Sequence, residues 1–159
     1  MPRSPKDPRN AARSYAYKLL SYRSRSRKEM LDKLRTKGFE DEDVSAVMEF
    51  LETSGLINDA KLASELLGYS AGSRPLGKNG IRMLMLKRGI DKGIVDETLY
   101  SHTAEMEERA AIEFAERRSR ALRNYPADVA KRRLWAMLQR RGFSVGVISK
   151  VINTAIRNL

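Results

Sequence analysis

The chain has 159 residues and a formal net charge of +11, and its 42% of hydrophobic and 32% of charged residues are typical of a globular protein rather than a disordered one. The absence of cysteine excludes disulfides, thiolate metal sites and a cysteine nucleophile, and is typical of the reducing cytoplasm. No apolar run approaches the roughly 20 residues that cross a bilayer, and none forms a secretory signal, so we expect a cytoplasmic protein without a membrane span.

Helix signals open the chain. Asp7 followed by Pro8 is an N-cap with proline at the first helical position, and the helix that starts there is predicted to run through Leu20. The segment "SRKE" (Ser26 to Glu29) is a capping box and starts a second helix, which Gly38 ends. A third helix is predicted from an apolar stripe of helical period formed by Val44, Val47, Met48 and Leu51.

The rest of the chain is also predicted to be helical. A helix starts near Asn58, and "EMEERAAIEFAERRSRAL" (Glu105 to Leu122) carries acids early and arginines late, as the helix dipole favours. Pro126 is expected in the first turn of the helix that follows. No stretch alternates polar and apolar residues over a useful length, so no strand is predicted.

Three segments close in the same way, namely "KLRTKGF" (33–39), "LMLKRGI" (84–90) and "MLQRRGF" (137–143). Each glycine is predicted to be the left-handed C′ residue of a helix, because a residue without Cβ adopts positive φ most easily. The two positions that touch in a Schellman cap are apolar in every copy. The three sets are Gly38 with Leu34 and Phe39, Gly89 with Met85 and Ile90, and Gly142 with Leu138 and Phe143. Gly55 is expected to cap a helix likewise, with Leu51 and Leu56 in contact.

In the three repeated segments, the residue after the apolar one is predicted to be the N-cap of another helix. The three N-caps are Glu40, Asp91 and Ser144. The apolar residue before each N-cap can form a hydrophobic staple with the residue four positions after the N-cap, which is Val44, Val95 or Ile148. Three copies in register predict a structural repeat.

The repeat predicts an all-α fold of three tandem three-helix units in an elongated, curved array. Each unit is expected to bury part of its apolar face against its neighbour. The predicted boundaries are a basic N-terminal tail at 1–10 and units at 11–56, 57–103 and 104–159.

Residues for catalysis are scarce. His102 is the single histidine, and the sequence has no HExxH pair, no P-loop and no dinucleotide fingerprint. The acidic run "EDED" (Glu40 to Asp43) lies in the first turn of a predicted helix, where carboxylates favour the dipole, and the glycine spacing of a calcium loop is missing. We therefore predict no catalytic residue, no metal site and no cofactor.

Positive charge is concentrated in the last third of the chain. Residues 1–56 carry +3, residues 57–103 carry +2 and residues 104–159 carry +6. Such an excess favours a polyanionic partner, either nucleic acid or an acidic protein surface. On a helical wheel Leu134, Trp135 and Leu138 point into the third unit, and basic residues cover the opposite face. The contact surface predicted there comprises Arg132, Arg133, Arg140 and Arg141, with Arg117, Arg118, Arg120 and Arg123 nearby.

The corresponding faces of the first two units are less basic. The first unit mixes basic and acidic residues, namely Lys28 and Arg35 with Glu29 and Asp32. The second unit offers Lys87 beside Met83 and Leu86, two apolar residues that are predicted to pack against the first helix of that unit. Lys28, Arg35 and Lys87 complete the predicted contact set.

The order of four segments resembles the RecX family of recombinase regulators. "RSRSRKEMLDKLRTKGF" (Arg23 to Phe39) is similar to the signature of its first repeat. "GLINDAKLASEL" (Gly55 to Leu66) is similar to its linker into the second repeat, with Leu62 where an aromatic residue is more usual. "GKNGIRMLMLKRGI" (Gly77 to Ile90) and "LQRRGF" (Leu138 to Phe143) are similar to its second and third repeats. The likeness covers about residues 11–157.

The resemblance implies a cytoplasmic bacterial protein of three three-helix repeats without catalytic activity. Members of that family bind the RecA recombinase, above all its filament on single-stranded DNA, and usually suppress its ATPase, strand-exchange and coprotease activities from the filament groove. A monomer that contacts single-stranded DNA weakly or only within the RecA filament is expected. The residues alone leave an alternative open, a stand-alone helical-repeat protein that binds DNA or RNA.

Overall fold

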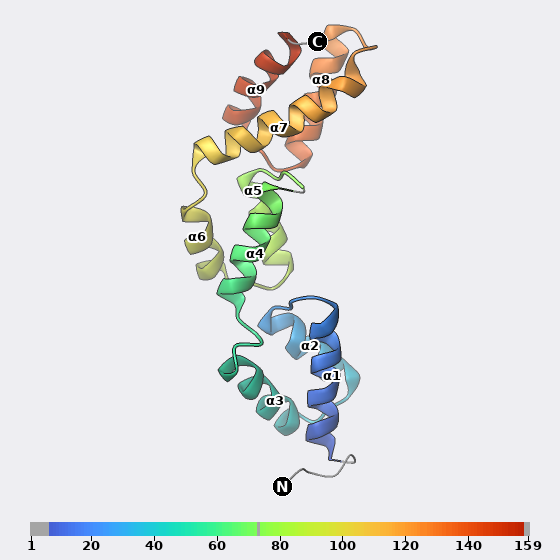
Figure 1. Ribbon diagram of the computed structural model, residues 1–159, viewed down its shortest axis with the longest axis vertical. Coiled ribbons are helices and arrows are strands. Elements are labelled where there is room, and N and C mark those ends of the chain that lie inside the picture. The colour runs from blue at the N-terminus through green and yellow to red at the C-terminus, as the bar shows by residue number, and fades with distance from the viewer. Residues whose placement is uncertain (1–6, 73, 158–159) are drawn as a thin grey trace.

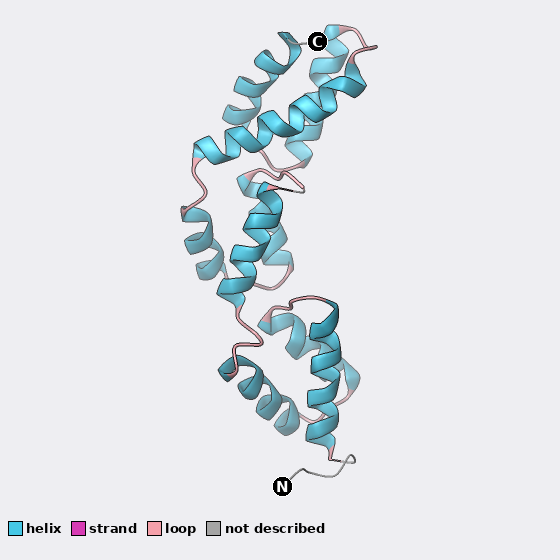
Figure 2. Cartoon of the chain, in the orientation of Figure 1, coloured by secondary structure: helices cyan, strands magenta, loops and turns pink. Residues whose placement is uncertain are grey.

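The computed structural model describes residues 7–72 and 74–157 of the chain, and within them it contains nine helices and no strand (Figure 2). The helices are α1 (Pro8–Tyr22), α2 (Arg27–Lys37), α3 (Asp41–Thr53), α4 (Asp59–Ala71), α5 (Lys78–Lys87), α6 (Lys92–Tyr100), α7 (Ala104–Leu122), α8 (Ala127–Arg140) and α9 (Val145–Arg157). The predicted all-α class is therefore confirmed.

The helices pack in groups of three that follow one another along an elongated, curved molecule (Figure 1). The first unit is α1–α3, the second α4–α6 and the third α7–α9. The buried apolar residues form three separate clusters, one inside each unit. The predicted array of three-helix units is confirmed, but the units do not share an apolar core, and polar groups make the described contacts at the joints between them.

The three glycine caps have the predicted geometry. Gly38, Gly89 and Gly142 have φ values of 94°, 76° and 77°. The N–H of the apolar residue after each glycine donates a hydrogen bond to the carbonyl oxygen five residues before it, which closes a Schellman cap. These bonds join Phe39 to Leu34 at 3.4 Å, Ile90 to Met85 at 3.1 Å and Phe143 to Leu138 at 3.3 Å.

The predicted helix starts are also confirmed. The side chains of Asp7, Asn58 and Asp91 accept hydrogen bonds from N–H groups in the first turns of their helices, and Ser26 with Glu29 forms the capping box. The staple residues Val44, Val95 and Ile148 are each at most 1% exposed. The acidic residues from Glu40 to Asp43 occupy the N-cap and first turn of α3.

Several local predictions were wrong. The cap at Gly55 uses Ile57, whose N–H bonds the Leu51 carbonyl oxygen at 3.1 Å and which is 4% exposed, whereas Leu56 is 47% exposed. Pro126 is the N-cap of α8 and precedes its first turn. Residues 1–6 of the predicted tail lie outside the described residues, and residues 8–10 belong to α1.

Met83 and Leu86 do not pack against α4. They are 65% and 39% exposed, whereas Ile81 and Met85 are fully buried and form the core side of α5. With 3.6 residues per turn, Met83 lies almost opposite Ile81 and Met85, and Leu86 lies well outside their stripe. Arg82 and Leu84 lie at the sides of this stripe and are half-buried.

The first joint connects the start of α2 to the end of α5. The Ser26 hydroxyl donates a hydrogen bond to the carbonyl oxygen of Arg88, the C-cap of α5. The Arg88 guanidinium bonds both carboxylate oxygens of Glu29, at 2.7 and 3.2 Å, and the carbonyl oxygen of Ser24 at 2.7 Å. The positive end of the α2 dipole thus faces the negative end of the α5 dipole.

The second joint repeats this relationship between α5 and α8. The N–H of Gly77, the N-cap of α5, donates to the carbonyl oxygen of Arg141, the C-cap of α8, at 3.0 Å. A Cβ on Gly77 would lie 2.2 Å from the Phe143 Cα, and one on Gly80 would lie 2.2 Å from the Arg141 oxygen. The glycines of "GKNG" (Gly77 to Gly80) therefore permit a close backbone approach. The second helices of the three units follow one another end to end.

Candidate interaction surface

The exposed face of α8 is basic, as predicted. Leu134 and Leu138 are fully buried, and Trp135 is half-buried against the core of the third unit. Arg132, Arg133 and Arg140 are exposed. The helical period of the apolar residues therefore directs the basic side chains away from the core.

The arginines of this surface mostly lack acidic partners. Within the described part of the chain, seven of the predicted residues belong to no ion pair: Arg118, Arg120, Arg123, Arg132, Arg133, Arg140 and Arg141. Arg117 is the exception, because it pairs with Glu113 one turn earlier on α7. Their charges are therefore available to an external anion.

The basic residues predicted in the first unit are instead neutralised. Lys28 Nζ lies 2.7 Å from Asp32, and Arg35 Nε lies 3.3 Å from Asp41. Lys87 on α5 is exposed and, among the residues described, takes part in no ion pair. The structure thus separates the predicted contact set into paired side chains in the first unit and largely unpaired ones in the third.

Three of the unpaired arginines converge. Arg118 of α7, with Arg140 and Arg141 at the end of α8, lines a cavity of about 280 Å³ together with Phe114 and Met137. We refer to this cavity as the arginine hollow. The guanidinium carbons of Arg141 and Arg118 lie 5.1 and 5.5 Å from the centre of the Phe114 ring, within the range of cation–π attraction.

The remaining arginines lie apart from the hollow. Arg133 stacks on the ring of Tyr125, with its guanidinium carbon 4.2 Å from the ring centre. Arg120, Arg123 and Arg132 are exposed and line none of the described cavities. The surface therefore combines one concave group of arginines with scattered positive charge. Guanidinium groups suit this arrangement because each offers several N–H donors to an oxyanion.

Two glutamates position the units, a role that the sequence analysis did not predict for either of them. Glu107 of α7 is 5% exposed, and its carboxylate oxygen Oε1 accepts hydrogen bonds from the N–H groups of Lys78 and Ser144, each at 3.1 Å. It thereby binds the starts of α5 and α9 together. The only sequence signal was an acid early in a helix, which does not reveal such a partner.

Glu29 was predicted as a capping residue but not as a joint residue. Partial burial disfavours its charged form, yet hydrogen bonds from Arg88, the Ser26 N–H and Arg23 outweigh this and lower the pKa of Glu29 below its ordinary value. The carboxylate therefore stays ionised at neutral pH and holds the orientation of the first unit against the second.

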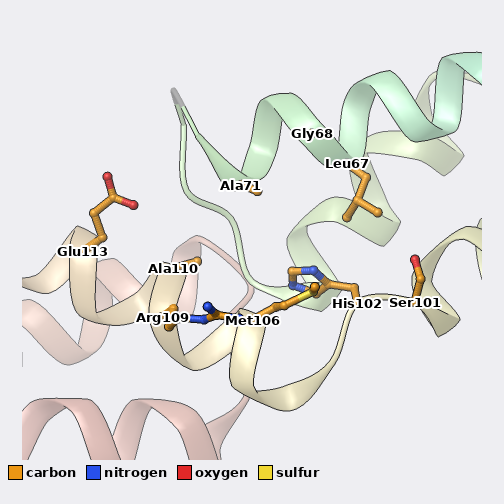
Figure 3. A pocket seen from close by; sticks show the side chains of 9 residues that line it. All are labelled: Leu67, Gly68, Ala71, Ser101, His102, Met106, Arg109, Ala110 and Glu113. Atoms are coloured by element: carbon orange, nitrogen blue, oxygen red, sulfur yellow. The ribbon is translucent and has the colours of Figure 1, made fainter.

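A larger and mainly apolar pocket of about 450 Å³ lies where α4 meets α7 (Figure 3). Figure 3 shows the side chains of His102 and Met106 on the side facing Leu67 of α4. His102 is 3% exposed, and burial lowers its pKa although the charge of Glu107 opposes this shift. The imidazole is therefore neutral at pH 7, and the charged groups that line the pocket are Arg109 and Glu113 of α7.

Groups for metal chemistry or membrane insertion do not stand out. Among the described residues, no three or more His, Asp or Glu side chains form a group that could hold a metal ion. Within the same ranges, no helix has both the length and the apolar character to cross a bilayer.

The chain is similar to known proteins over most of its length. Two family models match the chain, that of the first three-helix domain of RecX over residues 12–51 and that of the third three-helix domain over residues 106–152. The chain is 34% identical over 145 residues to the regulatory protein RecX of Chlorobium limicola, covering 91% of this chain and 89% of that protein. It is 30% identical over 152 residues to the regulatory protein RecX of Streptomyces lividans, covering 96% and 81%.

A solved structure has the same arrangement of helices. The crystal structure of RecX from Lactobacillus salivarius superposes with a TM-score of 0.80 at 25% sequence identity, and the match covers 94% of this chain and 97% of that one. The likeness therefore includes all three units rather than one of them.

Proposed function

Because the chain belongs to the RecX family of regulatory proteins, as its matches over nine tenths of its length establish, we propose that it binds the RecA recombinase and its filament on single-stranded DNA. Binding is proposed to lower the recombinase, ATPase and coprotease activities of RecA and so to restrain DNA repair by recombination and the SOS response. The protein would act in the cytoplasm, as a monomer and without catalysis of its own.

The observation that carries this proposal is the set of unpaired arginines on α7 and α8. A surface whose arginines mostly lack acidic partners is suited to a polyanionic assembly. A filament of protein on DNA presents both phosphate and acidic side chains along its groove. Arg132 and Arg140 face outward on α8, so both can reach such a groove without any change in the fold.

The shape of the molecule supports the same proposal. The end-to-end order of α8, α5 and α2 provides one long, continuous side to the array, and hydrogen bonds at two joints hold this order, from side chains at the first joint and between backbone groups at the second. An elongated protein can span several subunits of a filament. We propose that the array lies along the groove and that the third unit supplies most of the electrostatic attraction.

A stand-alone protein that binds DNA or RNA is the second candidate. The same unpaired arginines favour it, since phosphate contacts alone give binding that is strong at low salt and indifferent to sequence. The two candidate functions predict different affinities. A RecA regulator binds the RecA filament more tightly than bare DNA, whereas a stand-alone nucleic-acid-binding protein binds bare DNA equally well.

The test is a titration of the protein into the DNA-dependent ATPase assay of RecA, with binding to bare single-stranded DNA measured in parallel near 0.15 M salt, where the Debye length is about 8 Å. We expect the ATPase rate to fall and the filament to be bound far more tightly than bare DNA. An unchanged ATPase rate together with equal affinity for bare DNA and filament would exclude RecA modulation and favour the second candidate.

A further inference from the structure

The arginine hollow concentrates positive charge without an internal counter-ion. Arg118, Arg140 and Arg141 line it with Phe114 and Met137, and no carboxylate is among the lining residues. Within the described part of the chain none of the three arginines forms an ion pair elsewhere. Like charges that converge in this way repel one another, and an anion that enters the hollow relieves the repulsion.

Two of the three guanidinium groups are held in place before any ligand binds. Arg141 is half-buried, stacks on the Phe114 ring and donates to the carbonyl oxygen of Pro75 at 3.5 Å. Arg118 lies over the same ring. Less side-chain entropy is therefore lost when an oxyanion binds, which makes the hollow a more favourable site than exposed arginines of equal charge.

The surroundings of the hollow fit a protein rather than a nucleic acid. Single-stranded nucleic acids are bound on exposed aromatic rings beside a basic groove. Phe114 is 5% exposed, and the ring of Tyr125 is already stacked with Arg133. The Phe114 ring therefore offers no face to a base, and on Tyr125, which is 41% exposed, Arg133 already occupies one face of the ring.

Exposed apolar side chains lie on α5, the helix whose start contacts the end of α8. Asn79 donates its N–H to the carbonyl oxygen of Gly142 at 3.2 Å, which places the start of α5 against the end of α8. Met83, one turn further along α5, is 65% exposed, and Leu86 is 39% exposed. Apolar side chains next to arginines are typical of protein–protein interfaces and contribute nothing to phosphate binding.

We propose that the arginine hollow binds the carboxylate of an acidic side chain on the surface of a protein partner, and that Met83 and Leu86 contact apolar residues of the same partner. This inference rests on the proposed function, under which that partner is RecA. The hollow is thus a specific anchor for protein, while the remaining arginines attract any polyanion.

The test compares two double variants that lose the same charge from the same unit. Arg118→Gln with Arg140→Gln removes two arginines of the hollow, and Arg120→Gln with Arg123→Gln removes two exposed arginines outside it. We expect the hollow variant to bind the RecA filament at least about tenfold more weakly, as expected for lost charge-assisted hydrogen bonds, and the control variant to change by less than about threefold. Both variants should bind bare oligo(dT) equally, because diffuse attraction alone operates there.

Equal losses for both variants on the filament would overturn the inference, because they would reduce the hollow to ordinary surface charge. A loss by the hollow variant that is confined to oligo(dT) would also overturn it and assign the site to phosphate. Thermal melting of both variants shows whether loss of the Arg118 contact with Phe114 unfolds the third unit. If the third unit unfolds, the single variants Arg140→Gln, in the hollow, and Arg123→Gln, outside it, are compared for binding to the RecA filament instead.

A second measurement does not depend on RecA. Arginine Nε–H resonances of the whole protein are followed by NMR during titration with an acetylated tetraglutamate peptide and, separately, with oligo(dT). We expect the peptide to shift Arg118, Arg140 and Arg141 more than Arg120 and Arg123. Uniform shifts, or a selective response to oligo(dT) only, would contradict the carboxylate site. An unmodified protein that ignores RecA yet shows the selective peptide response would refute the proposed function and leave the carboxylate site standing.

Discussion

Glu29 and Arg88 lie 59 residues apart in the sequence and form an ion pair in which each side chain is 19% exposed and Nε lies 2.7 Å from Oε1. Glu29 also accepts the Ser26 N–H at 3.0 Å as part of the capping box of α2. One carboxylate therefore stabilises the start of a helix and fixes the neighbouring unit. Folding of the first unit and its orientation against the second depend on the same group.

Replacement of Glu29 by Gln is expected to destabilise the protein in a pH-dependent way. Because the pKa of Glu29 is lowered on folding, its charged form adds stability above its ordinary pKa of 4.5, and this stability is lost as the pH falls through the lower folded value. At pH 7 we expect a loss of about 1–2 kcal/mol. The difference from the parent should shrink in urea denaturation repeated near pH 3.

The control for this variant is Asp32→Asn. Asp32 pairs with Lys28 on the same helix, but the two side chains are 56% and 65% exposed, so the substitution should change stability by less than about 0.5 kcal/mol. A Glu29→Gln variant that matches the parent at pH 7, or a difference that grows at low pH, would show that the pair does not stabilise the joint.

Glu107 is expected to be the most sensitive acidic position of the third unit. Glu107→Ala leaves the N–H groups of Lys78 and Ser144 without their shared acceptor in a buried site, which should lower the free energy of unfolding by about 2–4 kcal/mol. Glu107→Gln keeps an acceptor oxygen and should lose less. Denaturation by urea measures both.

The matched control is its neighbour Glu108, which pairs with Lys150 at 3.4 Å and has a more accessible side chain. Glu108→Ala should be nearly neutral by comparison. Equal losses at the two positions would mean that the Glu107 hydrogen bonds contribute no more than a surface ion pair.

A glycine can be required by positive φ alone or also by a close backbone contact, and Gly38 and Gly142 are examples of the two cases. Both have positive φ, but a Cβ on Gly38 would meet nothing within 4 Å, whereas one on Gly142 would lie 2.2 Å from the backbone nitrogen of Gly80. Gly38→Ala should therefore reveal only left-handed strain, about 1–2 kcal/mol. Gly142→Ala should add a backbone clash at the second joint and lose about 3 kcal/mol or more. Thermal melts that show equal losses would argue against the close approach of α5 and α8.

Caps and helix starts were predictable because each depends on residues within one or two turns of one another. The Schellman pair of Leu138 and Phe143 and the staple at Ile148 can be read from their spacing alone. The exposure of Arg132 and Arg140 also follows from the period of the apolar residues on α8. These features made up most of the fold and the outline of the basic surface.

Contacts between units could not be predicted in this way. Nothing in the sequence near Glu29 indicates that its partner is Arg88. The need for glycine in "GKNG" is explained only by the structure, in which the backbone of Arg141 and Phe143 lies against Gly80 and Gly77. The hollow likewise combines Arg118 of α7 with Arg140 of α8, whose convergence depends on how the two helices pack. Sequence period indicates which residues face outward, but tertiary packing decides which of them meet a carboxylate.

The basic face of α8 can be tested against the equivalent face of α2 by charge reversal at two positions each. Arg132→Glu with Arg140→Glu reverses two arginines that lack acidic partners, and Lys28→Glu with Arg35→Glu reverses two residues already paired with Asp32 and Asp41. Under the proposed function, the α8 variant should suppress the RecA ATPase much less than the parent does, and the α2 variant should retain most of the effect. Folding should survive in the α8 variant, because surface changes outside the core usually alter stability by about 0.5 kcal/mol or less each.

The salt dependence of the ATPase titration distinguishes a lost electrostatic contact with the filament from misfolding of the α8 variant. The Debye length falls from roughly 10 Å at 0.1 M to roughly 3 Å at 1 M, so the gap between the parent and the α8 variant should narrow as salt rises. A defect that came from misfolding would persist at every salt concentration and would appear in a thermal melt. The ATPase titration is therefore run at two salt concentrations with melts of every variant. If the α8 variant melts normally and still suppresses RecA as well as the parent at low salt, the filament contacts another part of the protein.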